Sequence, residues 1–201
     1  MARFTRRELL APAPEVARLL IGARLISRID GHLTTVRLVE TEAYAPDDPA
    51  SHSFIGPTAR NATMFARPGL LYVYLSYGVH ACLNVVTGPE GEGSAVLLRA
   101  AEPLEGLDVM AGRRGSELPR NLCSGPGKLA ESLGLDVSHD GLDLVRGDLA
   151  WLERSPGAAG VVAGARVGIS KGTDRPWRFV EEGSAWASRP SLSGRGSVPS
   201  S

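Results

Sequence analysis

Short β-rich runs joined by tight turns constrain the fold of this chain more than any other feature of its sequence. Asp30-Gly31 separates two such runs, and an Asp-Gly pair accepts the positive φ angles of a two-residue hairpin turn. A second pair of runs flanks a turn at residues 76–79. Hairpins join antiparallel strands, so this pattern predicts a mostly antiparallel sheet. The expected strands are residues 25–29, 33–41, 70–75, 81–87, 94–100, 149–153, 161–169 and 185–187.

Helix signals lie between these runs. Thr5 followed by Glu8 predicts a capping box and a short helix that ends at Leu10. A Gly-rich stretch at residues 124–128 precedes an expected helix that Gly134 ends; its amides either hold an anion or form a simple helix-entry turn. The other expected helices are residues 14–20, 61–65, with Asn61 as the cap, and 104–113.

The length and composition indicate one folded domain. The chain has 201 residues, of which 43% are hydrophobic and 22% charged, as in an ordinary globular protein. We expect the domain to cover residues 1–189 and a disordered Ser/Gly/Pro tail to cover residues 190–201. No run approaches the roughly 20 apolar residues of a membrane span, and the N-terminus lacks the apolar region of a signal peptide. These features predict a cytoplasmic protein without a membrane partner.

The charges argue mildly against a nucleic-acid partner, because 22 basic residues are balanced by 22 acidic ones. They are segregated along the chain, however. Residues 1–37 carry seven Arg against three acids, whereas residues 131–153 carry six acids against Arg146 alone. A basic face opposite an acidic one is therefore compatible with the sequence.

The two cysteines, Cys82 and Cys123, form no CxxC pair and have no histidine at zinc spacing. We expect both to be small buried hydrophobic residues. The sequence therefore predicts neither a disulfide framework nor a structural zinc.

All four tyrosines lie between residues 44 and 77, although aromatic residues make up only 5% of the chain. A site that grips a flat ligand gathers rings in one place. Tyr72 and Tyr74 share one face of an expected strand, and Tyr77 falls in the second hairpin turn. The alternative is that Tyr72 and Tyr74 are core residues and Tyr77 packs on a neighbour. The pattern alone favours this alternative.

Charged side chains accompany the tyrosines. Glu40 and Glu42 share one face of an expected strand, as either a solvated strand end or a positioned acid or base. Arg99 lies in a buried-looking strand, and a buried guanidinium needs a partner such as Glu40 or Glu42. His52 lies in a long loop at residues 45–60; a lone loop histidine is usually exposed, but long loops are often functional.

Seven stretches carry, in their order along the chain, a resemblance that none carries alone. They are VETEAY, the His52 loop, TARNATMF, RPGLLYVYLSYGVHACLNVV, VLLRAAEPLEG, LCSGPGKLAESLGL and ARVGIS. Across residues 7–188 this set resembles the alkyladenine (methylpurine, 3-methyladenine) DNA glycosylase family. The resemblance implies an enzyme that flips a damaged purine out of double-stranded DNA and hydrolyses its N-glycosidic bond, initiating base excision repair. It implies no cofactor and no metal.

The resemblance also implies roles for individual residues in the chemistry. Glu42 matches the general base that activates water, and Arg99 matches the group that orients this water. A carboxylate at this position also stabilises an oxocarbenium-like sugar. Glu40 is expected to be structural. No lysine lies in residues 39–84, which disfavours a Schiff-base lyase mechanism.

Four further positions match the family's base pocket, and one matches its DNA wedge. The rings of Tyr44 and Tyr74 match the pocket walls, and the His52 backbone matches the group that reads the purine edge. Asn84 matches the residue that disfavours the exocyclic amine of guanine. Tyr77 matches the side chain that fills the vacated base stack, which offsets part of the unstacking cost.

The sequence therefore predicts a single α+β domain, a curved, mostly antiparallel sheet flanked by helices, that acts as a monomeric DNA glycosylase. Two other functions stay open. One is a non-catalytic nucleic-acid-binding module that uses the same tyrosines. The other is a hydrolase of small nucleosides or glycosides that uses Glu40 and Glu42. The preferred lesion and the group that protonates a neutral leaving base are not fixed by the sequence.

Overall fold

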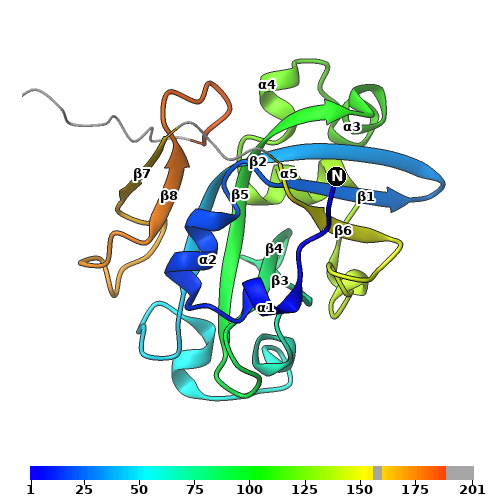
Figure 1. The fold of residues 1–201 in the computed structure, drawn as a ribbon. Helices are drawn as coiled ribbons and strands as arrows, with labels where there is room; N and C mark the ends of the chain where they lie inside the picture. Colours follow the sequence, from blue (N-terminus) through cyan, green and yellow to red (C-terminus); the bar gives the residue numbers. More distant parts are fainter. Residues whose placement is uncertain (156–159, 189–201) are drawn as a thin grey trace, which may run out of the picture.

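A curled antiparallel sheet forms the centre of the structure, a computed structural model that describes residues 1–155 and 160–188 (Figure 1). Its strand order is β3-β4-β5-β2-β1-β6, with β8 added to β2 and β7 added to β8. All these strand pairs are antiparallel, as predicted. The strands are β1 (Arg24–Ile29), β2 (His32–Tyr44), β3 (Leu71–Ser76), β4 (His80–Thr87), β5 (Ser94–Glu105), β6 (Ala150–Glu153), β7 (Val161–Gly164) and β8 (Arg178–Glu181).

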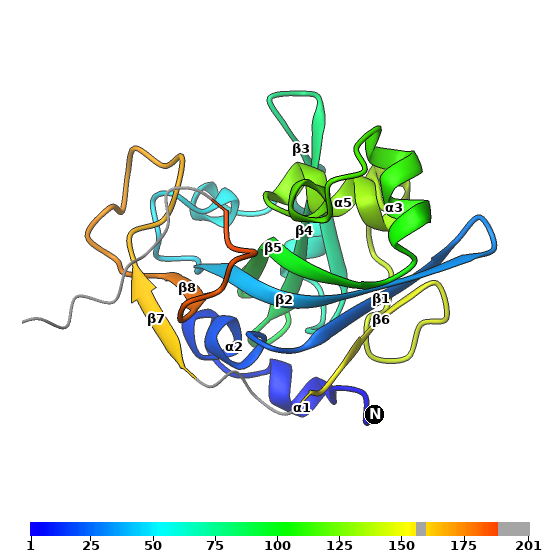
Figure 2. The ribbon, with the colours of Figure 1, turned by 90° about the horizontal axis from the view of Figure 1, so that it is seen from above.

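Short helices cover the sheet. In Figure 2, α1 and α2 lie on one side of β2 and β5, and α3 and α5 lie on the other. Helix α5 buries Leu129 and Leu133, one turn apart, against β4 and β5. The helices are α1 (Arg6–Leu9), α2 (Ala13–Leu19), α3 (Leu107–Arg114), α4 (Pro119–Leu122) and α5 (Pro126–Leu133), with 3₁₀ turns η1 (His52–Ile55), η2 (Ala62–Phe65) and η3 (Val137–His139). The predicted fold class is confirmed.

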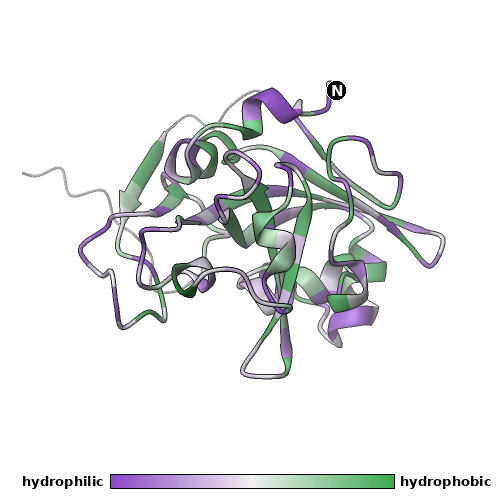
Figure 3. Ribbon diagram, turned by 90° about the horizontal axis from the view of Figure 1, so that it is seen from below, coloured by the Kyte–Doolittle hydropathy of each residue, from purple (hydrophilic) through white to green (hydrophobic). Residues whose placement is uncertain are grey.

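The apolar residues of the strands and covering helices form one large buried core, and the outer loops are mostly hydrophilic (Figure 3). A smaller cluster of Met64, Tyr72, Val86 and Ala95 lies beside it, with Tyr44 and Tyr74 packed on its edge. Cys82 and Cys123 are both buried, as expected. In the part of the chain that the structure describes, no helix is long and apolar enough to cross a membrane.

The Asp30-Gly31 turn and the Thr5–Glu8 capping box predicted from the sequence are confirmed. Asp30 and Gly31 adopt φ angles of 55° and 76° between the paired residues Ile29 and His32. The Glu8 carboxylate accepts a hydrogen bond from the backbone N–H of Thr5 at 2.8 Å, which forms the expected capping box. Local chemistry alone therefore determined these two features.

The C-terminal strands were predicted wrongly. Strand β7 ends at Gly164 rather than at residue 169, and residues 185–187 form no strand. The last strand is β8, at residues where the sequence predicts no strand. It forms through its pairing with β2 and β7. The expected tail, residues 190–201, lies outside the described residues.

Two local expectations fail in instructive ways. Strand β5 continues to Glu105, so helix α3 begins at Leu107 instead of residue 104, because β5 stays paired with β2. The Asn61 side chain does not cap η2. Its amide donates to the carbonyls of His52 and Gly56, which holds the 45–60 loop together.

The long strand β2 changes partners along one edge, and this change creates the site. Its first half pairs with β1, up to Arg37, and residues Glu40–Glu42 pair with β8. The other edge pairs with β5, with register shifts on both sides of Glu40. The two acidic residues predicted at a strand end therefore lie in the middle of the sheet.

Candidate active site

Glu40 and Glu42 are both completely buried, at 0% exposure, which excludes the solvated strand end. Both reach the guanidinium of Arg99 on β5. Nε of Arg99 donates to Oε1 of Glu40 at 2.8 Å, and Nη1 donates to Oε2 of Glu42 at 3.4 Å. The expected pairing of Arg99 with these carboxylates is thus present. Burial of such charges is tolerated only with this kind of pairing.

Glu40 is neutralised more completely than Glu42. Nε of Arg178 on β8 donates to Oε1 of Glu40 at 2.8 Å. The backbone N–H and the hydroxyl of Ser188 donate to its two oxygens at 2.6 and 2.8 Å. Burial raises the pKa of Glu40, but Arg99, Arg178 and the Ser188 donors together outweigh it and leave the pKa below its ordinary value. Glu40 therefore stays ionised and is fully engaged as a structural anchor.

Glu42 has fewer donors and a different protonation behaviour. The backbone N–H of Val167 donates to Oε1 at 2.7 Å, and the Tyr44 hydroxyl donates to Oε2 at 2.9 Å. Burial raises the pKa of Glu42 above its ordinary value, in spite of the opposing effect of Arg99 and these two hydrogen bonds. Two carboxylates two residues apart thus have pKa values shifted in opposite directions, the pattern of a site with divided acid–base roles.

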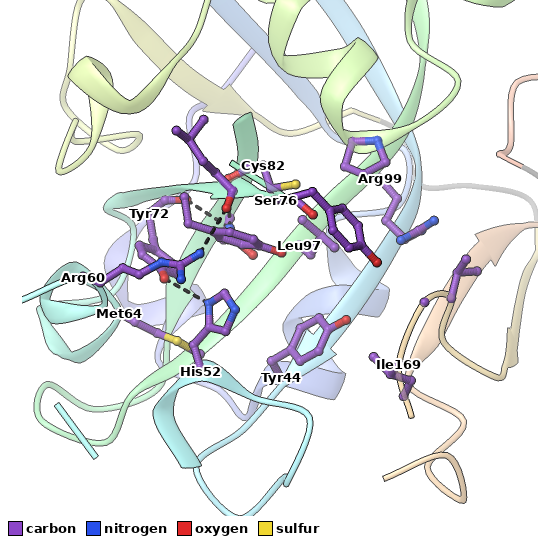
Figure 4. A pocket seen from close by; sticks show the side chains of 17 residues that line it. Tyr44, His52, Arg60, Met64, Tyr72, Ser76, Cys82, Leu97, Arg99 and Ile169 are labelled. Carbon is purple, nitrogen blue, oxygen red and sulfur yellow. Dashed lines mark hydrogen bonds between the residues drawn. The ribbon is translucent and has the colours of Figure 1, made fainter. Parts of the chain in front are cut away.

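A cavity of about 420 Å³ opens beside this pair (Figure 4). Tyr44, at the end of β2, and Tyr74, on β3, contribute rings to its wall, and Arg99 forms part of the wall as well. Glu42 itself does not line the cavity: Tyr44 and Arg99, which hydrogen-bond to it, stand in between. Burial raises the pKa of both tyrosines, so each phenol stays protonated and can donate.

His52 contributes an aromatic edge to the same cavity. Its ring centroid lies 4.5 Å from that of Tyr74 in an edge-on arrangement. Its Nδ1 lies 3.1 Å from the Tyr72 hydroxyl. Burial lowers the pKa of His52, with a contribution from Arg60, so the ring is neutral near pH 7. The 45–60 loop therefore places the ring edge of His52 at the site, although the residue as a whole is exposed.

Asn84 lines the cavity and is buried. Its side-chain nitrogen donates to the carbonyls of Tyr72 and Cys82, each at 3.1 Å. These bonds orient the amide, since both of its donors are used by the backbone. The amide oxygen is the part of Asn84 left to face a ligand.

Tyr77 lies at the tip of the β3–β4 hairpin, which projects from the body of the molecule (Figure 2). The side chain is 93% exposed and also borders the cavity. Its φ angle is 51°, a left-handed conformation that is unfavourable for a bulky residue. Tyr77 does not pack on a neighbour, so the structural alternative fails at this position. Tyr72, by contrast, is a core residue at 2% exposure.

A second cavity, also about 420 Å³, adjoins the first at Arg99. Arg120 and Lys128 line it as well, together with Ser188 and the loop before α5, and its described lining has no acidic residue. Gly125 begins α5 by accepting a hydrogen bond from Leu129 N–H. The Gly-rich stretch is thus a helix entry beside a positively charged hollow, and both interpretations of it remain compatible with the structure.

All the predicted site residues are brought together around the first cavity: six line it and Glu42 lies directly behind it. The sequence did not reveal the anchors from the C-terminal third, Arg178 and Ser188 on Glu40 and the Val167 amide on Glu42. Val167 lies in the ARVGIS stretch, which was the available signal. Among the described residues, no group of three or more His, Cys, Asp or Glu side chains is arranged to hold a metal ion.

A buried carboxylate–guanidinium pair thus lies behind an aromatic cavity, with an exposed ring at its rim, and a cavity of this kind suits a flat ligand. The comparison with protein families identifies the family of the chain. The model described as methylpurine-DNA glycosylase (MPG) matches residues 7–185. The chain belongs to this family.

Curated relatives agree over most of their length. A protein from Rhodopseudomonas palustris (strain HaA2) is 49% identical over 188 residues, 94% of this chain and 89% of the relative. One from Nitrosospira multiformis is 50% identical, covering 90% of this chain and 91% of the relative. One from Rubrobacter xylanophilus is 47% identical, covering 88% and 93%. All three carry the name "Putative 3-methyladenine DNA glycosylase".

Proposed function

We propose that this protein is a DNA glycosylase that removes alkylated purines from duplex DNA by hydrolysis, as the first step of base excision repair. The observation that carries the proposal is the junction of three features at one place. These are a ring-lined cavity, the buried pair of Glu42 and Arg99 behind it, and the exposed Tyr77 at its rim. The family membership and the names of the relatives point to the same activity.

The cavity accepts a single base and not a duplex, so the damaged nucleotide leaves the helix to be bound. Tyr44 and Tyr74 stack on the extruded purine, and the His52 backbone reads its edge. A cationic lesion gains a further cation–π attraction of about 0.5–2 kcal/mol. Asn84, whose side-chain amide is fixed by the carbonyls of Tyr72 and Cys82, disfavours the exocyclic amine of ordinary guanine.

Tyr77 takes the place of the extruded base. The hairpin projects beyond the body of the protein (Figure 2), so a ring at its tip can reach into a duplex. A wedge of this kind offsets part of the few kcal/mol lost on unstacking. The left-handed backbone of Tyr77 is that of a primed hairpin turn, closed by the Val79 N–H bond to the Ser76 carbonyl, and it puts the ring at the tip of the hairpin.

Glu42 acts as the general base for the attacking water. Both of its oxygens are occupied in the free protein, by the Val167 amide, the Tyr44 hydroxyl and Arg99. Water reaches Oε2 when the phenol of Tyr44 turns from the carboxylate toward the bound base. Arg99 stays in place and orients this water, while the carboxylate stabilises the positive charge that develops on the sugar.

The reaction ends with base release, and the sugar–phosphate strand is not cut. An imine-forming lyase needs an amine at the sugar, and the described lining of the first cavity contains no lysine. The second cavity, lined by Arg99, Arg120 and Lys128, accepts backbone phosphate next to the flipped nucleotide.

Duplex oligonucleotides that contain a single 1,N6-ethenoadenine or 3-methyladenine test this function. We expect abasic sites, seen as strand breaks after alkali treatment, with and without EDTA. Intact strands at a large excess of enzyme would contradict the proposal.

The same assay separates the two other functions. A binding module would retain lesion affinity without any base release. A small-molecule hydrolase would cleave the free ethenoadenosine nucleoside. We expect this protein not to cleave it, because a free nucleoside has no base stack for Tyr77 to enter and no phosphate for the second cavity to bind.

A further inference from the structure

Arg166 is a buried charged residue that has no part in the mechanism described above. Its side chain and that of Asp48 both have 0% exposure, and the two form an ion pair through both guanidinium Nη atoms. Nη1 also donates to the carbonyl of Ala43 at 2.9 Å, and Nη2 donates to that of Gly172 at 3.0 Å. One guanidinium thus ties together the end of β2, the 45–60 loop and the segment after β7.

The guanidinium also lies against aromatic rings. Its central carbon is 4.7 Å from the ring centroid of Tyr44 and 5.6 Å from that of Trp177. Tyr44 lines the base cavity and Arg166 does not, so Arg166 supports the Tyr44 ring from behind. A planar, charged group on a ring is a stabilising arrangement that lysine reproduces poorly.

The residue that follows Arg166 in the chain holds Glu42. The backbone N–H of Val167 donates to Oε1 of Glu42 at 2.7 Å, and the hydroxyl of Tyr44 donates to Oε2 at 2.9 Å. Glu42 accepts one further hydrogen bond, from Arg99. Its other two donors, the Val167 amide and the Tyr44 hydroxyl, both belong to groups next to Arg166: Val167 follows it in the chain, and the Tyr44 ring packs on its guanidinium.

We propose that Arg166, clamped by Asp48, is a positioning residue that sets the hydrogen-bonded geometry of Glu42 and the orientation of the Tyr44 ring toward the base. This role rests on the proposed function of Glu42 and Tyr44, but the geometry of the free protein can be measured without any activity. Arg166 touches neither the substrate nor the reacting atoms.

The charged and titratable groups that face Glu42 are Arg99, Glu40, Tyr44 and Tyr74. Burial raises the pKa of Glu42, and the Val167 and Tyr44 hydrogen bonds lower it. A change at Arg166 that keeps the positive charge but loosens these two bonds therefore raises the pKa of Glu42. A simple loss of packing elsewhere in the fold leaves that pKa unchanged.

The test is Arg166→Lys. Lysine keeps a positive charge for Asp48 but loses the planar guanidinium that binds the carbonyls of Ala43 and Gly172 and packs on the Tyr44 ring. The main readout is the Glu42 carboxyl titration in the free protein by ¹³C NMR, assigned with Glu42→Gln. We expect the midpoint to rise by roughly one pH unit. We also expect kcat/KM for base release to fall on the order of tenfold and its acid limb to move to higher pH.

Arg37→Lys is the matched control. Arg37 also forms a forked pair, with Glu181, and its Nε binds Glu102, but these contacts lie on the far half of β2. We expect this variant to lose thermal stability while the Glu42 midpoint stays at its wild-type value. Equal midpoints in wild type, Arg37→Lys and Arg166→Lys would overturn the proposal, since Arg166 would then be only structural.

Gly172→Ala serves if Arg166→Lys does not fold. A Cβ at residue 172 would lie 2.6 Å from Oδ1 of Asp48 and 3.1 Å from Nη2 of Arg166, so it displaces the clamp while keeping both charges. The Glu42 midpoint should rise here as well, and an unchanged midpoint would contradict the positioning role. The two proposals can fail separately. If the Glu42 midpoint rises in these variants but the wild-type protein releases no base, the proposed function is refuted and the positioning role stands.

Discussion

At the scale of single residues, the site depends on giving two glutamates of the same strand different environments. Glu40 receives donors from Arg99, Arg178 and Ser188, which hold its pKa below the ordinary value. For Glu42, burial is the largest influence on the pKa and raises it above the ordinary value. The spacing of two residues would suit an inverting carboxylate pair, but Glu40 is bound by two guanidinium groups and by both Ser188 donors, so we assign it a structural role.

In the proposed mechanism the pH dependence of the reaction follows from Glu42, which must be ionised to accept a proton. Because its pKa in the folded protein is raised, kcat/KM is expected to fall with decreasing pH at a midpoint above the ordinary glutamate value of 4.5. Tyr44→Phe removes a hydrogen bond that lowers this pKa, so the acid limb should move to higher pH.

Tyr72→Phe is the control for that measurement, because the Tyr72 hydroxyl contacts His52 and not Glu42. Its acid limb should coincide with that of the wild type. A Tyr44→Phe profile that also coincides with wild type would show that Glu42 is not the titrating base.

The contacts of the site were predictable from the sequence where the partners share a short motif or where a buried charge requires a partner of opposite charge. The buried Arg99 needed a carboxylate, and Glu40 and Glu42 were the candidates. The anchors Arg178, Ser188 and Arg166 were missed because they lie more than 100 positions away from the groups they bind. Spacing along the chain does not reveal such partners; the pairing of β8 with β2 is what brings Arg178 to Glu40.

At the scale of elements, the β3–β4 hairpin carries Tyr77, the ring that we propose enters the DNA. Tyr77→Ala removes the ring and leaves the hairpin, since the side chain is 93% exposed and supports no core. We expect thermal stability within error of wild type and a roughly tenfold or greater loss of affinity for lesion-containing duplex. Affinity for the same lesion in a single strand should change much less, because no base stack has to be filled there. An equal loss on both substrates would argue against the wedge.

The hairpin turn between β1 and β2 tests whether local chemistry defines that element. Gly31 has a φ of 76° and open space around its Cα, so Gly31→Ala adds only backbone strain. We expect the free energy of unfolding to fall by about 1 kcal/mol, with base release unchanged.

Gly112→Ala is the opposite case within the same protein. Gly112 lies inside α3, also with open space, so alanine should raise the free energy of unfolding by about 0.5–1 kcal/mol. Denaturant melts of both variants measure the pair. Shifts of the same sign would show that the turn does not require a left-handed residue.

Element by element, hairpins and capped helices were predictable, because Asp30-Gly31, Thr5 with Glu8, and Gly134 act through local geometry. Strand β8 was not predictable in this way, because its formation depends on its pairing with β2. The long β5 was cut short for the same reason. Tertiary pairing decided each element that was missed.

At the scale of the whole molecule, a balanced net charge coexists with a local accumulation of cations. The chain carries 22 basic and 22 acidic residues, yet Arg99, Arg120 and Lys128 meet around one hollow beside the base cavity. The global charge therefore predicts weak nonspecific DNA binding, and the local arrangement supports a phosphate contact at the site itself. Composition alone argued against a nucleic-acid partner because it averages over this arrangement.

The central claim is that Glu42 activates the water that releases the base. The most direct test compares wild type with Glu42→Gln in single-turnover release of 1,N6-ethenoadenine from duplex DNA, with binding measured on the same substrate. We predict a loss of roughly 10²–10⁴-fold in the release rate with lesion affinity retained, because glutamine keeps the size and loses the base. Release by Glu42→Gln at the wild-type rate would contradict the claim.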